Sequence, residues 1–122
     1  MSEVAKTILF IMQRAPYGSS ATREALDAAL ASAAFEQTVQ LLFCGDGVWH
    51  LITDQRPHLI NAKDTSKMLQ ALEYYDISDV YADKSSLADR QLDSNALAIP
   101  AKPVDDDSIR QLVKKADCVI AL

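Results

Sequence analysis

Thr7-Ile-Leu-Phe-Ile-Met12 is an apolar run of strand length, and the turn sequence Ala15-Pro16-Tyr17-Gly18-Ser19-Ser20 follows it. Over residues 21–35, apolar side chains recur at helical spacing and charged side chains occupy the other faces. A strand, a glycine-containing turn and a helix make the opening unit of a parallel α/β sheet. Ligands and partners of such sheets usually bind at loops that leave the carboxyl ends of the strands. The loop over residues 13–20 is the first of these.

The alternation of strand and helix patterns continues along the chain. Further apolar runs predict strands at residues 39–44, 79–82, 97–99 and 118–122. Helical spacing and capping residues predict helices over residues 66–74 and 85–90 and a last helix that starts within Pro103-Val104-Asp105-Asp106-Asp107, with a short helix or irregular segment at 48–52. The sequence therefore predicts one α/β domain over residues 1–122. Its architecture is a five-stranded parallel sheet with helices on both faces, a flavodoxin-like three-layer sandwich.

The composition narrows the class of protein. A chain of 122 residues with 49% hydrophobic and 24% charged side chains is ordinary for one globular domain. Its net charge of -5 argues against a phosphate-binding surface, so we expect no direct binding of nucleic acid. No apolar run is long enough to span a bilayer, and the N-terminus lacks the pattern of a signal peptide. We therefore expect a cytoplasmic protein without membrane contact.

The loop sequences exclude two common functions of doubly wound sheets. A phosphoacceptor domain needs clustered carboxylates after its first strand, and Gln13-Arg14-Ala15 stands there instead. A dinucleotide site needs Gly-x-Gly-x-x-Gly, whereas Gly18 stands alone. The start of the first helix is open to two interpretations, a weak anion site or an ordinary turn capped by Ser20 or Thr22.

The candidate site residues lie in the first two carboxyl-end loops. We expect a partner interface or binding loop that comprises Pro16, Tyr17, Gly18, Asp46, Gly47, Val48, Trp49 and His50. Among these, Tyr17, Val48 and Trp49 are the candidate exposed apolar surface, although Trp49 suits the core equally well. His50 suits a packed or interface histidine. No nucleophile–base pair is evident, so no catalytic residue is expected.

The two cysteines give little sign of redox or metal chemistry. Cys44 ends a predicted buried strand, which favours an inert structural thiol over a sulfur carrier. Two cysteines, Cys44 and Cys118, cannot form a zinc site alone, so neither a metal nor a cofactor is expected.

Several fragments, in order along the chain, resemble the DsrE/DsrF-like family and, within it, the TusC (DsrF) branch. They are Ala15-Pro16-Tyr17-Gly18, Arg23-Glu24-Ala25-Leu26-Asp27-Ala28, Phe43-Cys44-Gly45-Asp46-Gly47-Val48 with Leu51, Tyr74-Tyr75-Asp76-Ile77, and Ser86-Leu87 with Arg90 and Leu92. The resemblance implies a five-stranded parallel sheet with helices on both sides. It also implies a role in a sulfur relay, in which a persulfide passes between proteins towards 2-thiouridine formation at the tRNA wobble position.

The resemblance further implies how labour is divided among subunits. The sulfur-carrying cysteine of the family belongs to the TusD (DsrE) subunit, and Asp83 occupies the matching position here. The chain would then be a non-catalytic subunit of a hetero-oligomer, a heterohexamer with TusB- and TusD-like partners, and a possible homo-oligomer when isolated. Two alternatives remain at this point, a stand-alone small-molecule or anion-binding domain and a persulfide carrier that uses Cys44.

Overall fold

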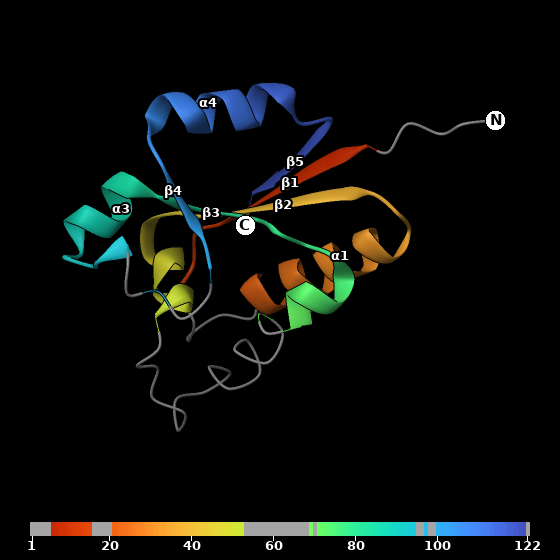
Figure 1. Ribbon diagram of the computed structural model, residues 1–122, viewed down its shortest axis with the longest axis horizontal. Coiled ribbons are helices and arrows are strands. Elements are labelled where there is room, and N and C mark those ends of the chain that lie inside the picture. Colours follow the sequence, from red (N-terminus) through yellow and green to blue (C-terminus); the bar gives the residue numbers. More distant parts are fainter. Residues whose placement is uncertain are drawn as a thin grey trace.

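The computed structural model describes residues 6–15, 21–52, 69, 71–94, 97 and 100–121. Strands and helices alternate along the described chain, as Figure 1 shows. The elements are β1 (Thr7–Met12), α1 (Ala21–Ala34), β2 (Thr38–Phe43), the 3-10 helices η1 (Gly45–Leu51) and η2 (Ala71–Tyr75), β3 (Asp79–Asp83), α3 (Lys84–Asp89), β4 (Lys102–Val104), α4 (Asp106–Lys115) and β5 (Cys118–Ala121). None of the described helices has the length and hydrophobicity that a bilayer span requires.

The described strands form one parallel sheet in the order β4-β3-β2-β1-β5. The predicted fold class is thus confirmed, although this order differs from the 2-1-3-4-5 order of flavodoxin itself. The chain steps outward from β1 to β4 and then returns to the far side of β1. Because parallel crossovers are right-handed, this reversal places α1 and α4 on opposite faces of the sheet (Figure 1).

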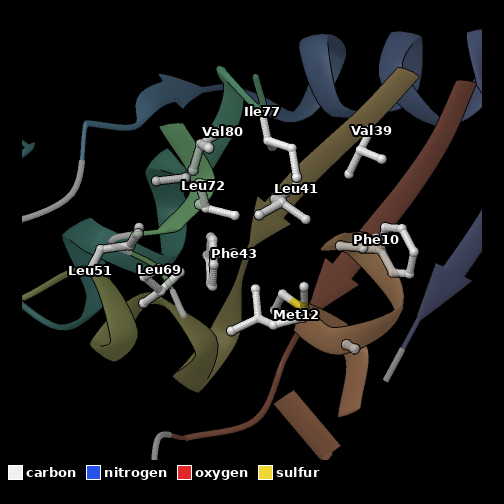
Figure 2. Packing of buried hydrophobic residues seen from close by; sticks show 14 of the residues in the cluster. Phe10, Met12, Val39, Leu41, Phe43, Leu51, Leu69, Leu72, Ile77 and Val80 are labelled. Atoms are coloured by element: carbon white, nitrogen blue, oxygen red, sulfur yellow. The ribbon is translucent and has the colours of Figure 1, made fainter. Parts of the chain in front are cut away.

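The two faces of the sheet are covered unequally. The larger core lies on the α1 side, where alternate residues of β1, β2 and β3 pack against α1, η1 and η2 (Figure 2). The smaller cluster lies on the α4 side and consists of Leu9, Leu42 and Val104, with partly buried residues of α4 packed on it. No residue of α4 is itself buried. Successive residues of β1 and β2 face the two clusters in turn, so both faces of these strands are covered. This explains why their sequences are continuous apolar runs.

The fourth strand was predicted in the wrong place. Of the predicted strand at 97–99, residues 98 and 99 lie outside the described residues, and Leu97 makes an isolated antiparallel bridge with Ile52. The fourth strand of the described sheet is Lys102–Val104. Pro103, which we expected at the start of the last helix, lies within this strand, and α4 begins at Asp106. A proline is tolerated there because β4 is an edge strand that needs ladder bonds on one side only. Most of the helix predicted over 66–74 falls outside the described residues, and the 3-10 helix η2 occupies Ala71–Tyr75.

Candidate functional site

Three segments meet at the carboxyl ends of the inner strands. Gln13 begins the segment after β1, the 3-10 helix η1 follows β2, and the short helix α3 follows β3. Because β1, β2 and β3 are parallel neighbours, these segments leave the sheet at the same edge, where α3 contacts η1 (Figure 1). We call residues 13–15, 44–51 and 83–90 the carboxyl edge.

Asp83 is the N-cap residue of α3, so the helix that we predicted over residues 85–90 begins one residue earlier, at Lys84. Its Oδ1 accepts a hydrogen bond from the Ser85 backbone N–H at 3.3 Å, and its Oδ2 accepts one from the Ser86 hydroxyl at 2.6 Å. The Ser86 oxygen in turn accepts from the Gly45 backbone N–H at 2.8 Å. Ser86 is only 6% exposed. The two bonds of the Ser86 hydroxyl, which are part-buried, therefore join the start of η1 to the start of α3.

Arg90 makes a second connection between the same two elements. Its guanidinium donates to the Asp46 carboxylate, from Nη2 at 3.0 Å and from Nε at 3.3 Å. Its Nη1 also donates to the Ser86 carbonyl oxygen at 3.1 Å. Asp46 thus lies on the surface of the carboxyl edge, and its carboxylate is held by an arginine that is 44 residues distant in sequence.

Cys44 follows directly after β2 and is half-buried rather than enclosed in the strand. Its backbone N–H donates to the Met12 carbonyl oxygen at 3.1 Å, which fixes the residue against the end of β1. Burial, and secondarily the negative charge of Asp83, raise the pKa of the Cys44 thiol. Since the thiolate is the reactive form, this environment opposes nucleophilic or sulfur-carrying chemistry at Cys44.

His50 is a packed residue, which is one of the two interpretations that the sequence allows. It is 5% exposed, and its Nε2 lies 3.0 Å from the Arg14 carbonyl oxygen, which makes Nε2 the donor. Its ring centroid lies 6.0 Å from that of Phe43. Burial lowers the pKa of His50 to about 4, against the smaller opposing effect of the Arg14 hydrogen bond. Nδ1 is a buried acceptor for which the described residues supply no hydrogen-bond partner.

The prediction that Val48 belongs to an exposed interface was wrong. Val48 is fully buried in the main core, and Gly47 is buried beside it. A Cβ atom at Gly47 would lie 2.0 Å from the Met12 carbonyl oxygen, so only glycine fits this close approach. This contact draws η1 against the end of β1, and Val48 consequently faces the core.

Trp49, in η1, is half-buried. Pro16, Tyr17 and Gly18 lie outside the described residues. Of the predicted interface residues, Asp46 and Trp49 therefore have accessible side chains, whereas Val48 and His50 do not. In the part of the chain that the structure describes, no group of three or more His, Cys, Asp or Glu residues is arranged to hold a metal ion.

Sequence reasoning missed the roles of Ser86 and Arg90. The available signal was local, because an Asp followed by a Ser three positions later is a typical helix start. The bonds from Ser86 to Gly45 and from Arg90 to Asp46 depend on tertiary placement, and no pattern along the chain reveals them.

Comparisons with known proteins add a family context to this geometry. The sequence profile of the DsrE/DsrF-like family matches residues 6–122. A Pseudomonas aeruginosa protein named "Protein TusC homolog" is 36% identical over 119 residues, which cover 98% of this chain and 100% of that protein. An Escherichia coli protein named "Protein TusC" is 33% identical over 116 residues, which cover 94% of this chain and 98% of that protein.

A solved structure is similar in fold. The crystal structure of the ychN protein from Escherichia coli superposes with a TM-score of 0.78. The match covers 96% of this chain and 99% of that chain at 22% sequence identity. At this level of identity, the likeness bears on the fold alone.

Proposed function

This chain belongs to the DsrE/DsrF-like family, and from that membership we propose that it is a TusC-like, non-catalytic subunit of a sulfur-relay complex. It acts in the cytoplasm with TusB- and TusD-like subunits, in a hetero-oligomer of the heterohexamer type. The complex delivers persulfide sulfur towards 2-thiouridine at the tRNA wobble position. The similarity to TusC proteins over nearly the whole chain supports this assignment.

One observation carries the non-catalytic part of the proposal. By the resemblance to the family, Asp83 corresponds to the sulfur-carrying cysteine of TusD-like subunits, and its carboxylate already accepts bonds from the Ser85 N–H and the Ser86 hydroxyl. A carboxylate is stable at a helix start for the same electrostatic reason that a persulfide anion would be, but it cannot bond sulfur. The site therefore has the environment of a sulfur carrier without the reacting atom.

The geometry disfavours the parts of both alternatives that fall within the described residues, whereas the Gly18 loop, which the first alternative also uses, lies outside them. An anion site in the Gly45–Gly47 turn would need free amides, but the Gly45 N–H donates to Ser86 and the Gly47 N–H donates to the Cys44 carbonyl oxygen. A persulfide carrier at Cys44 would need an accessible, acidic thiol, and the Cys44 pKa is raised. The subunit role is consistent with both observations.

Co-purification tests the assembly. Tagged chain, co-expressed with TusB- and TusD-like subunits, is expected to retain both through affinity and size-exclusion steps. Trp49→Ala is expected to weaken this association about 30-fold or more, the range of an interface hot spot, while the fold survives. Phe35→Ala is the matched control, because Phe35 is an aromatic side chain that is 78% exposed and follows α1 at the other end of the sheet.

The outcomes separate the alternatives clearly. Unchanged association of Trp49→Ala, together with loss of its folded circular-dichroism signal, would identify Trp49 as a core residue and overturn its interface role. Failure of the unaltered chain to retain either subunit would overturn the assembly itself. Cells that lack the natural gene are expected to lose wobble 2-thiouridine, which mass spectrometry of tRNA measures. Expression of the wild-type chain or of Asp83→Asn is expected to restore it. Sulfur transfer onto Cys44 from a persulfide donor would instead favour the carrier alternative.

A further inference from the structure

The exposed aromatic side chains of the described residues lie where the inner strands begin, opposite the carboxyl edge. Phe35 follows α1 and is 78% exposed, and the last two residues of η2, Tyr74 and Tyr75, are 89% and 43% exposed. The segments that hold them lead into the parallel neighbours β2 and β3, and α1 contacts η2 (Figure 1). The other aromatic side chains that the structure describes are buried or half-buried. Exposed aromatic groups that gather in one place are typical of a contact surface.

The two turns that carry these aromatic groups have the same backbone geometry. The Gln37 N–H donates to a carbonyl oxygen of α1 at 3.2 Å, and the Ile77 N–H donates to a carbonyl oxygen of η2 at 3.0 Å. The residue before each donor has a positive φ, +64° at Glu36 and +58° at Asp76. Glycine is the usual residue at this position of a helix end, but here both positions hold a carboxylate. An aromatic side chain followed by an acidic one therefore occurs in each turn.

The charge of the two turns is negative. Glu36 and Asp76 are both exposed. Glu36 also follows the C-terminal end of α1, where the helix dipole already contributes partial negative charge. Residues 35–37 and 74–78 contain no basic side chain, and Lys6, whose backbone N–H binds the Gln37 side chain, precedes β1 rather than β3. The negative potential of these turns therefore favours a cationic group at this place.

The turns are supported by the main core. Leu72 of η2 and Ile77 are buried members of the larger cluster, in which they pack with Leu41 of β2 (Figure 2). The aromatic and acidic side chains therefore project from a packed base. A partner that binds there has few backbone groups to order, which lowers the entropic cost of association.

We propose that Phe35, Glu36, Tyr74, Tyr75 and Asp76, which we call the amino-edge surface, form a docking site for an arginine-bearing segment of a partner protein. A guanidinium group stacks on an aromatic face and also pairs with a carboxylate through two parallel hydrogen bonds, so it suits both kinds of side chain. The carboxylates repel nucleic-acid phosphates and anionic lipid headgroups. A second copy docked by the same surface would oppose like charges, which disfavours it as the occupant.

This inference goes beyond the sulfur-relay role and does not depend on it. The proposed relay contact at Trp49 belongs to the carboxyl edge, at the other end of the strands from the amino-edge surface. Phe35→Ala is therefore expected to retain the relay subunits while it weakens docking here. Either proposal can fail while the other holds.

Fluorescence anisotropy of a labelled peptide of alternating arginine and glycine, titrated with the full chain, tests the role of charge. Saturable binding is expected, and salt should weaken it. Glu36→Gln combined with Asp76→Asn keeps the size of both side chains, and asparagine tolerates a positive φ, so this variant should raise the dissociation constant about tenfold without unfolding. Glu24→Gln combined with Asp27→Asn is the matched control, because both residues are exposed near the start of α1 and the change in net charge is the same. The control is expected to change the dissociation constant less than about twofold.

The same titration tests the aromatic groups. Phe35→Ala combined with Tyr74→Ala removes two exposed rings and should raise the dissociation constant about tenfold, since each exposed cation–π contact contributes a few-fold. Val113→Ala is the control, because Val113 is an apolar side chain that is 41% exposed on α4, at the opposite face of the sheet. It is expected to change the dissociation constant less than about twofold.

Nuclear magnetic resonance of the wild-type chain gives a second readout that needs no variant. Amide signals of residues 35–37 and 74–77 are expected to shift as the arginine peptide is added, whereas those of α4 stay in place.

Several results would each overturn the proposal. The first is the absence of saturable binding, or shifts that lie away from both turns. The second is equal weakening by the Glu24 and Asp27 control, which would show that net charge alone attracts the peptide. The third is unchanged binding after loss of the two rings. Tighter binding of an RNA oligonucleotide, or a dimer of the chain that the Phe35 and Tyr74 variant abolishes, would identify a different occupant.

Discussion

Helices α3 and α4 begin with the same capping chemistry in different surroundings. Each is capped by an aspartate at the carboxyl end of a strand: Asp83 is the last residue of β3, and Asp105 follows directly after β4. The Asp83 Oδ1 accepts from the Ser85 N–H at 3.3 Å, and the Asp105 Oδ1 accepts from the Ser108 N–H at 2.8 Å. Judged by the cap alone, α4 has the better bond.

The difference lies in what else each carboxylate holds. The second oxygen of Asp83 binds the buried Ser86 hydroxyl, which reaches Gly45 in the neighbouring loop. Asp105 is fully exposed, and its pKa is lowered by the Ser108 backbone and hydroxyl groups, with a smaller contribution from Lys84. The comparison teaches that an N-cap serves only its own helix unless a buried side chain connects it to a second element. Three experiments can break or sharpen that distinction.

Acid is expected to weaken the carboxyl edge well before it weakens the α4 cap. His50 has a pKa near 4 in the folded protein and 6.5 when unperturbed, so between these values the unfolded chain binds the proton and the folded chain does not. The contribution of neutral His50 to the free energy of unfolding is therefore complete above about pH 6.5. It is lost as the pH falls towards 4, and the total loss is about 3 kcal/mol. The pKa of Asp105 is lowered from 3.8, so its cap contributes above that value and is lost only at lower pH.

Urea unfolding at pH 7, 5.5 and 4 measures this loss, and residue-resolved hydrogen exchange assigns it to η1 or α4. His50→Gln retains a donor for the Arg14 carbonyl oxygen and is the control. Its stability is expected to change little over the same range. An equally steep pH dependence in His50→Gln would remove His50 as the cause.

A cysteine placed at each cap compares the two environments directly. Asp83→Cys is expected to give a thiol about two pKa units below the free value of about 8.5, because the Ser85 N–H and the Ser86 hydroxyl both face the position. Asp105→Cys also faces the Ser108 N–H and hydroxyl, but it is fully exposed, and solvent weakens their effect on the thiolate, so it is expected to titrate higher. Ultraviolet thiolate titration in a Cys44→Ala, Cys118→Ala background measures both values.

The same pair of variants tests sulfur acceptance. The Asp83→Cys thiolate is expected to attack the outer sulfur of a donor persulfide and release the donor thiolate, whereas the natural aspartate takes up none. Mass spectrometry detects the added sulfur. An Asp83→Cys thiol that titrates near 8.5 would show that α3 does not act on this position, and the match of Asp83 to the family's carrier cysteine would then be abandoned.

Replacing each capping aspartate by alanine is expected to lower the free energy of unfolding by the least of the three experiments, and by more at Asp83 than at Asp105. Asp83→Ala removes the helix cap and also leaves the Ser86 hydroxyl, which is buried, without its acceptor, at a cost of about 2 kcal/mol. Asp105→Ala removes an exposed cap only, so its effect is smaller. Urea unfolding at pH 7 ranks the two. Equal losses would mean that the connection through Ser86 adds nothing to the cap.

The sequence predicted the inner strands well for a physical reason. β1 and β2 are covered on both faces, so their apolar runs match their structural bounds to within one residue. Hydrophobicity misled at the outer strand, since Leu97 is apolar but only bridges Ile52, whereas Lys102–Val104 enters the sheet despite its proline. Whether a segment becomes an edge strand depends on where the tertiary fold places it, and the spacing of apolar residues along the chain does not reveal that placement.

The candidate site was predicted in part. Asp83 was singled out by the resemblance to the family, whereas local chemistry predicted a helix over 85–90 capped by Ser85 or Ser86; the structure instead has Asp83 as the N-cap residue of a helix that begins at Lys84. The burial of Val48 does not follow from local chemistry. It depends on the contact of Gly47 with the end of β1, and the Gly-Asp-Gly sequence indicates a turn without indicating which way the next residue faces.

The contact of Gly47 with the Met12 carbonyl oxygen determines which substitutions position 47 can tolerate. A Cβ there would meet backbone atoms, which cannot turn aside as a flexible side chain can. In a library that covers every substitution, position 47 should tolerate no replacement, and its variants should disappear through low cellular abundance rather than through a specific loss of activity. A Cβ at Gly45 would lie 3.7 Å from the Gln13 carbonyl oxygen, which is an ordinary contact, but the φ of this residue is +55°. Position 45 should therefore accept asparagine and little else. The two glycines of one turn thus face different selective pressures, one set by space and the other by backbone torsion.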